Sequence, residues 1–167
     1  MFKIFDLRIY LVLLILFSPG IGEAKKIRKD PMTLYDYIQV KCAKNCVDAY
    51  ESYRAVKSIS EEFKVDMYVL LAIMRVESAF SVTAKNGSNT GLMQINLRFH
   101  KPKFPNSNYT NVRENIRVGA IVYRDCLKRS KGSVDKALTC YNGNADPKYS
   151  SKVRKSVREL KALAVLL

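Results

Sequence analysis

One carboxylate stands on a strongly apolar face of a predicted helix. Residues 67–78 (MYVLLAIMRVES) have helical periodicity that places Glu77 over Ile73 and Leu70, with Met74 close beside them. Removing a carboxyl group from water disfavours its charged form and raises its pKa. Such a group stays protonated near neutral pH and can act as a general acid. The pattern therefore marks Glu77 as a candidate for proton transfer.

Periodicity alone favours a plainer role for the same residue. A glutamate near the end of a helix commonly forms a salt bridge with a nearby base, and Arg75 and Lys85 are both within reach of Glu77 in the sequence. The acid–base interpretation needs support from other parts of the chain.

Composition narrows the remaining chemistry. The 167 residues are enough for one domain with a substantial core. His100 is the only histidine, which excludes zinc sites with two or three histidines and the HExxH pattern. The chain contains no CxxC, GxGxxG or GxxxxGK[ST] pattern. We therefore expect no metal and no organic cofactor, and we expect His100 to be a surface residue.

The N-terminus has the pattern of a signal peptide. Two basic residues precede nine uninterrupted apolar residues, 9–17, a run too short for the 20 or so residues of a transmembrane helix. Small residues then precede a predicted cleavage site after Ala24. We expect a signal peptide over 1–24, a flexible basic lead-in over 25–32 and a single domain over 33–167, with an uncleaved membrane anchor as the alternative.

The charge of the chain points to anionic surroundings. Twenty-nine Lys and Arg against 15 Asp and Glu leave a net charge of +14, and the predicted signal peptide contributes two charges of each sign, so the exported domain keeps that value. For an exported protein, this charge suits a cell wall or another anionic surface. It also serves solubility alone. Export removes nucleic acid as a partner, although the charge by itself would suit one.

Four cysteines fit an oxidising compartment. Cys42, Cys46, Cys126 and Cys140 allow three pairings, and an even number in an exported chain predicts two disulfides. Proximity favours Cys42 with Cys46 and Cys126 with Cys140, while cross-pairing between the two groups stays open. Residues four apart in a regular helix seldom reach disulfide geometry, so a bend or a helix start is expected between Cys42 and Cys46.

Periodicity and capping residues predict a mostly helical domain with one irregular insert. Thr33, Asp66 and Ser133 are suitable helix N-caps. Turn residues followed by β-compatible residues predict a loop or short hairpin over 81–96, and prolines and asparagines predict the longest loop over 98–112. The predicted helices are 34–41, 50–64, 67–78, 112–128, 134–141 and 150–165.

Three stretches resemble the signatures of a known enzyme family. Residues 77–80 (ESAF), 91–96 (GLMQIN) and 137–143 (ALTCYNG) resemble, in order and spacing, the E-S, G-L-M-Q and A-Y-N motifs of lytic transglycosylases of the soluble-Slt, goose-lysozyme-like family. Residues 115–120 (NIRVGA) are similar to the helix that connects the last two motifs. The resemblance covers roughly 53–144.

This resemblance implies a lysozyme-like, mainly α fold with a short irregular or β-hairpin insert beside an active-site cleft. It implies that Glu77 protonates the glycosidic oxygen between N-acetylmuramic acid and N-acetylglucosamine. The same carboxylate would then accept the proton of the muramic C6 hydroxyl, which closes a 1,6-anhydro ring. One carboxylate suffices because the substrate supplies the nucleophile, whereas ordinary glycosidases use two.

The resemblance also implies substrate-binding roles for residues of the three motifs. Gln94 would hold the N-acetyl group, Tyr141 would place its hydroxyl near Glu77, and Ser78 would support the end of the Glu77 helix. Each motif residue considered alone is equally well explained by a structural role; Tyr141, for example, could be an aromatic residue of the core. The implied substrate-binding residues are Ser78, Leu92, Met93, Gln94, Tyr141 and Asn142.

The sequence departs from the family pattern next to Tyr141. Cys140 replaces the usual alanine, and Gly143-Asn144 replaces the usual Ala-Gly. If Cys140 pairs with Cys126, the disulfide would pin the helix that carries Tyr141.

Three other functions compete with a transglycosylase. A lysozyme-like hydrolase would need a second carboxylate, for which Asp125, Asp135 and Asp146 are the candidates. A non-catalytic assembly factor would bind glycan in the groove and a protein partner elsewhere. A nucleic-acid module needs only the positive charge.

We expect a periplasmic, wall-associated monomer that binds peptidoglycan strands, without membrane insertion after cleavage. Its short length is similar to that of a branch serving type IV or type III secretion machines.

Overall fold

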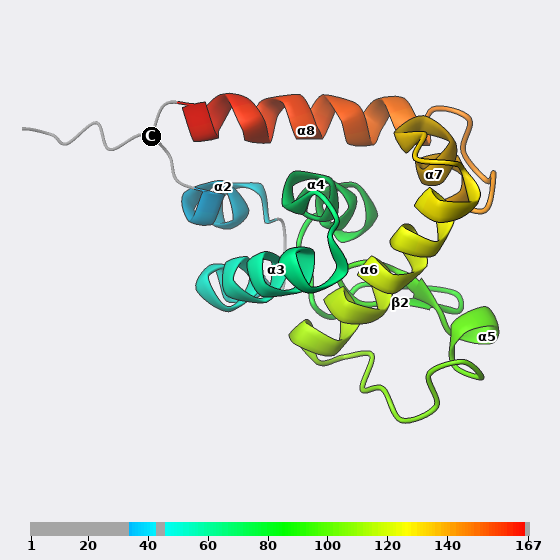
Figure 1. Cartoon of the computed structure of the whole chain (residues 1–167). Helices are drawn as coiled ribbons and strands as arrows, with labels where there is room; N and C mark the ends of the chain where they lie inside the picture. Colours follow the sequence, from blue (N-terminus) through cyan, green and yellow to red (C-terminus); the bar gives the residue numbers. More distant parts are fainter. Residues whose placement is uncertain (1–33, 43–45, 166–167) are drawn as a thin grey trace, which may run out of the picture. The chain divides into compact units, whose positions relative to one another are not determined.

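A computed structural model describes residues 34–42 and 46–165 and shows a mainly helical domain with a small sheet (Figure 1). The predicted signal peptide, the basic lead-in and Thr33 lie outside the described residues. The helices are α2 (Leu34–Lys41), α3 (Ala49–Phe63), α4 (Met67–Ser78), α5 (Leu97–His100), α6 (Val112–Arg129), α7 (Val134–Tyr141) and α8 (Tyr149–Val165). The strands are β1 (Lys85–Asn86), β2 (Asn89–Thr90) and β3 (Ile95–Asn96).

Short polar side chains begin the helices where capping chemistry predicts. The Asp66 carboxylate accepts a 2.8 Å hydrogen bond from the backbone N–H of Tyr68 and starts α4, while Asp48 does the same for α3 from Glu51. Ser133 stands at the predicted N-cap of α7, but its side chain makes no capping hydrogen bond. All six predicted longer helices are present, with ends within one residue of the expected ones.

The central helix is α4, as its apolar sequence predicts. Residues from Leu70 to Met74 are fully buried, and α4 packs against α8 on one side and α3 on another. Helix α6 packs against α3 and contributes Ile116 and Tyr123 to the same core. Burying each large apolar side chain stabilises the fold by roughly 1.5–3 kcal/mol. The core therefore fixes the position of α4, the helix that carries Glu77.

The irregular insert is a three-stranded antiparallel sheet followed by one helical turn. Strand β2 pairs with β1 in the register Asn86 to Asn89 and with β3 in the register Thr90 to Ile95. Gly87 occupies the β1–β2 turn with φ +58°, which a glycine adopts without strain. The mainly α, lysozyme-like class with a β-hairpin insert is thus confirmed.

The loop predicted over 98–112 is shorter than expected. Its first residues belong to α5, because the Asn96 side chain accepts a hydrogen bond from the N–H of Arg98 and caps that turn.

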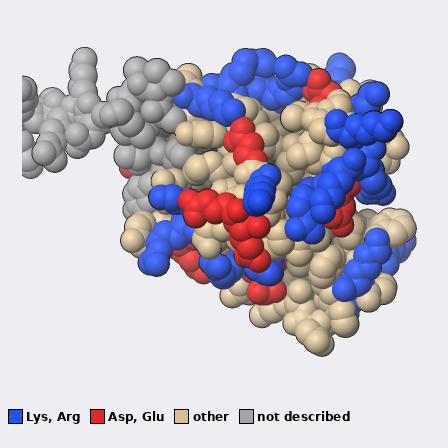
Figure 2. Space-filling model, in the orientation of Figure 1, with Lys and Arg blue, Asp and Glu red and all other residues tan. Residues whose placement is uncertain are grey.

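No helix among the described residues is both long enough and apolar enough to cross a membrane. The face in Figure 2 gathers lysine and arginine along the edge where α8 runs, and the exposed basic residues of α8 are Lys152, Arg154, Lys155, Arg158 and Lys161.

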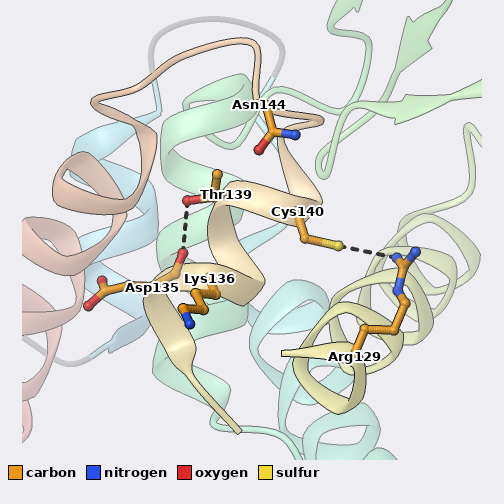
Figure 3. A pocket seen from close by; sticks show the side chains of 6 residues that line it. All are labelled: Arg129, Asp135, Lys136, Thr139, Cys140 and Asn144. Atoms are coloured by element: carbon orange, nitrogen blue, oxygen red, sulfur yellow. Dashed lines mark hydrogen bonds between the residues drawn. The ribbon is translucent and has the colours of Figure 1, made fainter. Parts of the chain in front are cut away.

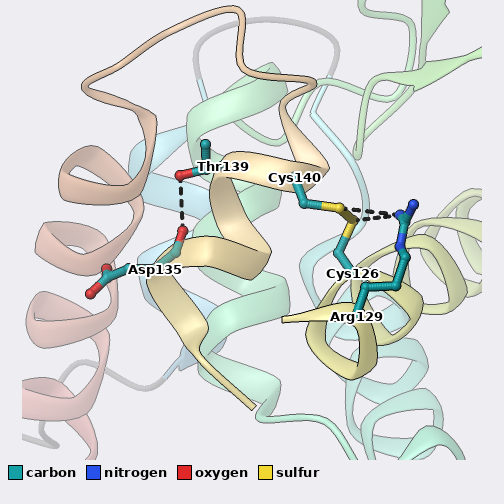
Figure 4. Close-up of a disulfide and its surroundings, with 5 residues drawn as sticks. All are labelled: Cys126, Arg129, Asp135, Thr139 and Cys140. Atoms are coloured by element: carbon teal, nitrogen blue, oxygen red, sulfur yellow. Dashed lines mark hydrogen bonds between the residues drawn. A yellow bond between two sulfur atoms is a disulfide. The ribbon is translucent and has the colours of Figure 1, made fainter. Parts of the chain in front are cut away.

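Both disulfides favoured by proximity are present. Cys42 and Cys46 are joined between α2 and α3 with their Cα atoms 5.6 Å apart, outside regular helix as expected. Cys126 of α6 is joined to Cys140 of α7 with a Cα separation of 5.7 Å (Figure 4). The second disulfide fastens the helix that ends with Tyr141 onto α6.

Replacing Cys126 and Cys140 together by alanine is expected to lower the free energy of unfolding by about 3 kcal/mol, because the bridge closes a loop of about 15 residues in the unfolded chain. Chemical denaturation followed by circular dichroism measures this change. The matched control is the alanine pair at Cys42 and Cys46, which opens a much shorter loop and should lower it by about 2 kcal/mol. An equal or greater loss in the control would contradict the loop-length account.

Candidate active site

The Glu77 side chain lines a cavity of ≈ 490 Å³, which four parts of the fold enclose. The end of α4 supplies the carboxylate, while the sheet with α5 forms one wall, α6 contributes side chains at its far end, and α7 with the loop after it forms the opposite wall. Motif residues and new residues line it together: Glu77, Asn89, Gln94, Phe99, Tyr141 and Asn142.

The environment of Glu77 favours its protonated form. Burial raises the pKa of this carboxyl above its usual value, and a hydrogen bond from the Tyr149 hydroxyl to Oε1, 2.6 Å long, works in the opposite direction. Neither Arg75 nor Lys85 forms a salt bridge with Glu77, and Arg75 is paired instead with Glu159 of α8. The plainer salt-bridge interpretation is therefore wrong for the described part of the chain.

Two tyrosines stand together beside the carboxylate. Tyr149 is buried at the first residue of α8, and its ring stacks on Tyr141 with centroids 6.5 Å apart and planes 16° from parallel. Burial, and then the nearby Glu77 charge, raise the pKa of Tyr141 well above its usual value. The Tyr141 hydroxyl donates a 2.8 Å hydrogen bond to the Met93 carbonyl, so Tyr149 rather than Tyr141 contacts Glu77.

Sequence reasoning missed Tyr149. It precedes the helix predicted over 150–165 by one residue and follows the last recognised motif, so neither periodicity nor resemblance marked it. The helix starts one residue earlier than predicted, and that residue carries the hydroxyl. A usable signal was the scarcity of apolar residues between Gly143 and Ser150, where a single large aromatic is a candidate to face inward.

Ser78 connects the first two motifs. Its hydroxyl lies 2.9 Å from the carbonyl oxygen of Met74 and 2.8 Å from that of Leu92, and donates to one of them at a time. The end of α4 is thereby held against the segment that carries Leu92 and Met93. Both of those side chains are fully buried and lie in the core, so they do not face the cavity.

Buried Asn115 fixes the second motif from α6. Its amide oxygen accepts a 2.8 Å hydrogen bond from the N–H of Met93, and its amide nitrogen donates to the carbonyls of Thr90 and Tyr109. A Cβ at Gly91 would lie 2.2 Å from the Asn115 amide nitrogen, and one at Gly119 would lie 2.3 Å from the Met93 sulfur. Only glycine allows this close packing at either position.

Gln94 and Asn142 face the cavity from opposite walls. Gln94 has φ +47°, and its amide nitrogen donates to the carbonyls of Gly91 and Ala84 at 2.9 and 3.0 Å. These bonds direct its amide oxygen to other partners, and no described residue donates to it. Asn142 lies after α7 and accepts a 2.7 Å hydrogen bond from the N–H of Asp146, which orders the loop behind it.

The three candidate second acids do not reach Glu77. Among the described residues, Glu77 is the only carboxylate that lines the cavity. Asp135 pairs with Arg154 and Asp146 pairs with Lys152, while Asp125 lies within 3.6 Å of Arg124. The site therefore offers one carboxyl group whose pKa burial raises, one phenol bound to it, amide groups on two walls and the His100 imidazole.

The arrangement agrees with a comparison against protein families. The model of the transglycosylase SLT domain matches residues 54–162. The chain belongs to this family. The match extends beyond the three motifs into α8 and so includes Tyr149 of this SLT domain. Members of the family are lytic transglycosylases that act on peptidoglycan. No solved structure matches the chain.

Replacing Glu77 by glutamine is expected to stabilise this SLT domain at neutral pH. Because the folded-state pKa of Glu77 is raised, the wild-type protein loses stability as pH rises from the usual glutamate pKa of about 4.3 through the folded-state value. The amide carries no charge, so the gain in melting temperature should be larger at pH 7.5 than at pH 4. Thermal unfolding followed by circular dichroism measures both values.

Glu159→Gln is the matched control with the opposite sign. Its hydrogen bond from Arg75 lowers the pKa of Glu159, so the wild-type carboxylate adds stability that is present at neutral pH and is lost on acidification. This variant should be less stable than the wild-type protein at pH 7.5. If Glu77→Gln were also less stable than the wild-type protein at pH 7.5, burial of the Glu77 carboxylate would not destabilise the folded protein.

Proposed function

We propose that this SLT domain is a lytic transglycosylase that cleaves the β-1,4 bond between N-acetylmuramic acid and N-acetylglucosamine and forms 1,6-anhydromuramyl products. The observation that carries the proposal is a lone, partly desolvated carboxyl group in the cavity. An ordinary inverting or retaining hydrolase uses a second carboxylate on the other side of the bond. None of the described residues supplies one there.

The reaction needs one group that gives and then takes the same proton. Protonated Glu77 would give its proton to the glycosidic oxygen as the bond to C1 breaks. The resulting carboxylate would accept the proton of the C6 hydroxyl as that oxygen bonds to C1, which restores the acid. The Tyr149 hydroxyl would stabilise the carboxylate between these steps, because it donates to the charged form.

Groups suited to a sugar line the rest of the cavity. The free acceptor of Gln94 can receive the N–H of an acetamido group, and Asn142 and Asn89 offer further amide contacts. Phe99 is 69% exposed although it is a large apolar side chain, and it lines the cavity from α5. An exposed aromatic beside polar amides suits the apolar face of a sugar ring.

Export to the periplasm and association with the cell wall are part of the same proposal. The N-terminal pattern supports export, and two disulfides suit an oxidising compartment. The basic face of α8 suits an anionic wall. We propose that the enzyme opens the wall locally, as a monomer, for a type IV or type III secretion machine. Its support is the signal-peptide pattern that precedes the SLT domain.

Mass spectrometry of muropeptides released from purified peptidoglycan by residues 25–167 tests the reaction. We expect products lighter by one water than their reducing-end counterparts. Glu77→Gln should release less than about a hundredth as much, because general acid–base catalysis contributes at least that factor. Tyr141→Phe should lose less activity than Glu77→Gln.

Reducing-end products would instead identify a hydrolase. Binding of glycan without any product, in the presence of an intact Glu77, would favour the non-catalytic assembly factor.

Tyr149→Phe should move the alkaline limb of the pH dependence of kcat/KM upward by about one pH unit. Removing the donor to the Glu77 carboxylate raises the pKa of this acid further, so the protonated form survives to higher pH. Tyr141→Phe is the matched control, because its hydroxyl contacts the Met93 carbonyl rather than Glu77. A limb that moved equally in both variants would mean that stacking of the two rings, and not the hydrogen bond, sets the pKa.

A further inference from the structure

A second pocket adjoins the cavity at Cys140, which is joined to Cys126 by a disulfide. It has a volume of ≈ 570 Å³ and lies between the end of α6, α7 and the loop that follows α7 (Figure 3). Arg129 and Cys140 line both this pocket and the Glu77 cavity, so the two spaces meet along these residues. The lining residues are Arg129, Asp135, Lys136, Thr139, Cys140 and Asn144.

The acid in this pocket already has a basic partner. The Asp135 carboxylate accepts hydrogen bonds from Ser150 at 2.5 Å and from Arg154 at 2.6 Å, both on α8. The Ser150 bond and the Arg154 charge lower the pKa of Asp135, which therefore stays ionised in this ion pair. In Figure 3 its carboxylate points away from Arg129 and Cys140.

The two bases of the pocket have no acidic partner. Neither Arg129 nor Lys136 forms an ion pair with any residue in the ranges 34–42 and 46–165. The Arg129 guanidinium lies on the disulfide, with Nη2 3.2 Å from the sulfurs of Cys126 and Cys140 (Figure 4). Disulfide sulfurs are weak acceptors, so this contact orients the guanidinium and leaves its charge and other donors available.

We propose that this pocket binds a carboxylate of the peptide that is attached to the muramic acid of the glycan strand. The inference rests on the proposed function, since it takes a glycan in the Glu77 cavity as given. Two cations without acidic partners suit a carboxylate, and Arg129, which the disulfide sulfurs orient, suits it best because its donors match two carboxylate oxygens. The pocket lining contains no aromatic residue, whereas the glycan cavity has Phe99 and Tyr141, so a further sugar ring suits it less.

The pocket would thereby give the enzyme a preference for strands that still carry their peptides. The peptide leaves the sugar through the lactyl group and is flexible enough to follow the shared edge at Cys140 into the pocket. The pocket is open to solvent, so each ion pair should contribute modestly and should weaken in salt. The preference is expected to appear in binding as well as in turnover.

Binding to the inactive Glu77→Gln protein tests the proposal without turnover. Isothermal titration compares a disaccharide–tetrapeptide with the same disaccharide after an amidase has removed the peptide. We expect the peptide-bearing ligand to bind more tightly. Adding Arg129→Gln and Lys136→Gln should weaken binding of this ligand by about five-fold more than binding of the peptide-free ligand at low salt. Lys136→Gln alone, at a residue that does not line the Glu77 cavity, should leave the peptide-free ligand unchanged. Arg129→Lys should recover part of the affinity, because it keeps the charge without the planar donor pair.

Lys128→Gln is the matched control, since Lys128 is an exposed base on the same helix that lines neither space. An equal loss for both ligands in the Arg129 and Lys136 variant would overturn the proposal, because it would assign these residues to the glycan cavity or to the fold. Equal affinity of the parent protein for the two ligands would also overturn it. If the wild-type protein bound the peptide-bearing ligand more tightly but formed no 1,6-anhydro product, the result would support peptide binding in this pocket and would contradict the proposed function.

Discussion

The candidate active site depends on holding one carboxyl group partly out of water without giving it a base as partner. Glu77 lies in the last turn of the most buried helix, where burial raises its pKa. The partial negative charge at the end of a helix acts in the same direction. The nearest base on α4, Arg75, is taken up by Glu159 of α8. Helix α8 thus removes a competing cation and also brings Tyr149 to the carboxylate.

The walls of the cavity are joined to this helix by backbone and amide hydrogen bonds rather than by charges. Ser78 connects α4 with the segment after β2, Asn115 connects that segment with α6, and Tyr141 connects it with α7. Gly91 and Gly119 allow these contacts to be close. Each of the three motifs therefore has a structural partner in another motif or its connecting helix, which explains why their order and spacing carry more information than any single residue.

Sequence reasoning succeeded where one physical signal dominates locally. Apolar periodicity located the long helices, Asp66 marked the start of α4, and the short spacing between cysteines favoured the observed pairs. It failed where the deciding contact is distant in the sequence. The bond between Tyr149 and Glu77 joins residues 72 positions apart, and the pairing of Arg75 with Glu159 joins residues 84 apart. The roles assigned to the motif residues stay predictions that the proposed experiments test.

The Cys126–Cys140 disulfide fixes the helix α7, which lines both the glycan cavity and the neighbouring pocket. Helix α7 presents Tyr141 to the glycan cavity and Lys136 to the neighbouring pocket, and its position relative to α6 decides both. A bond between Cys126 and Cys140 holds the two helices at the edge that the two spaces share, and its sulfurs orient Arg129 along that edge. An alanine at position 140 could pack there, but it could neither fasten α7 nor orient the guanidinium. Cys140, which replaces the alanine of the family motif, therefore lies at the edge shared by the cavity that would bind the glycan and the pocket that would bind the peptide.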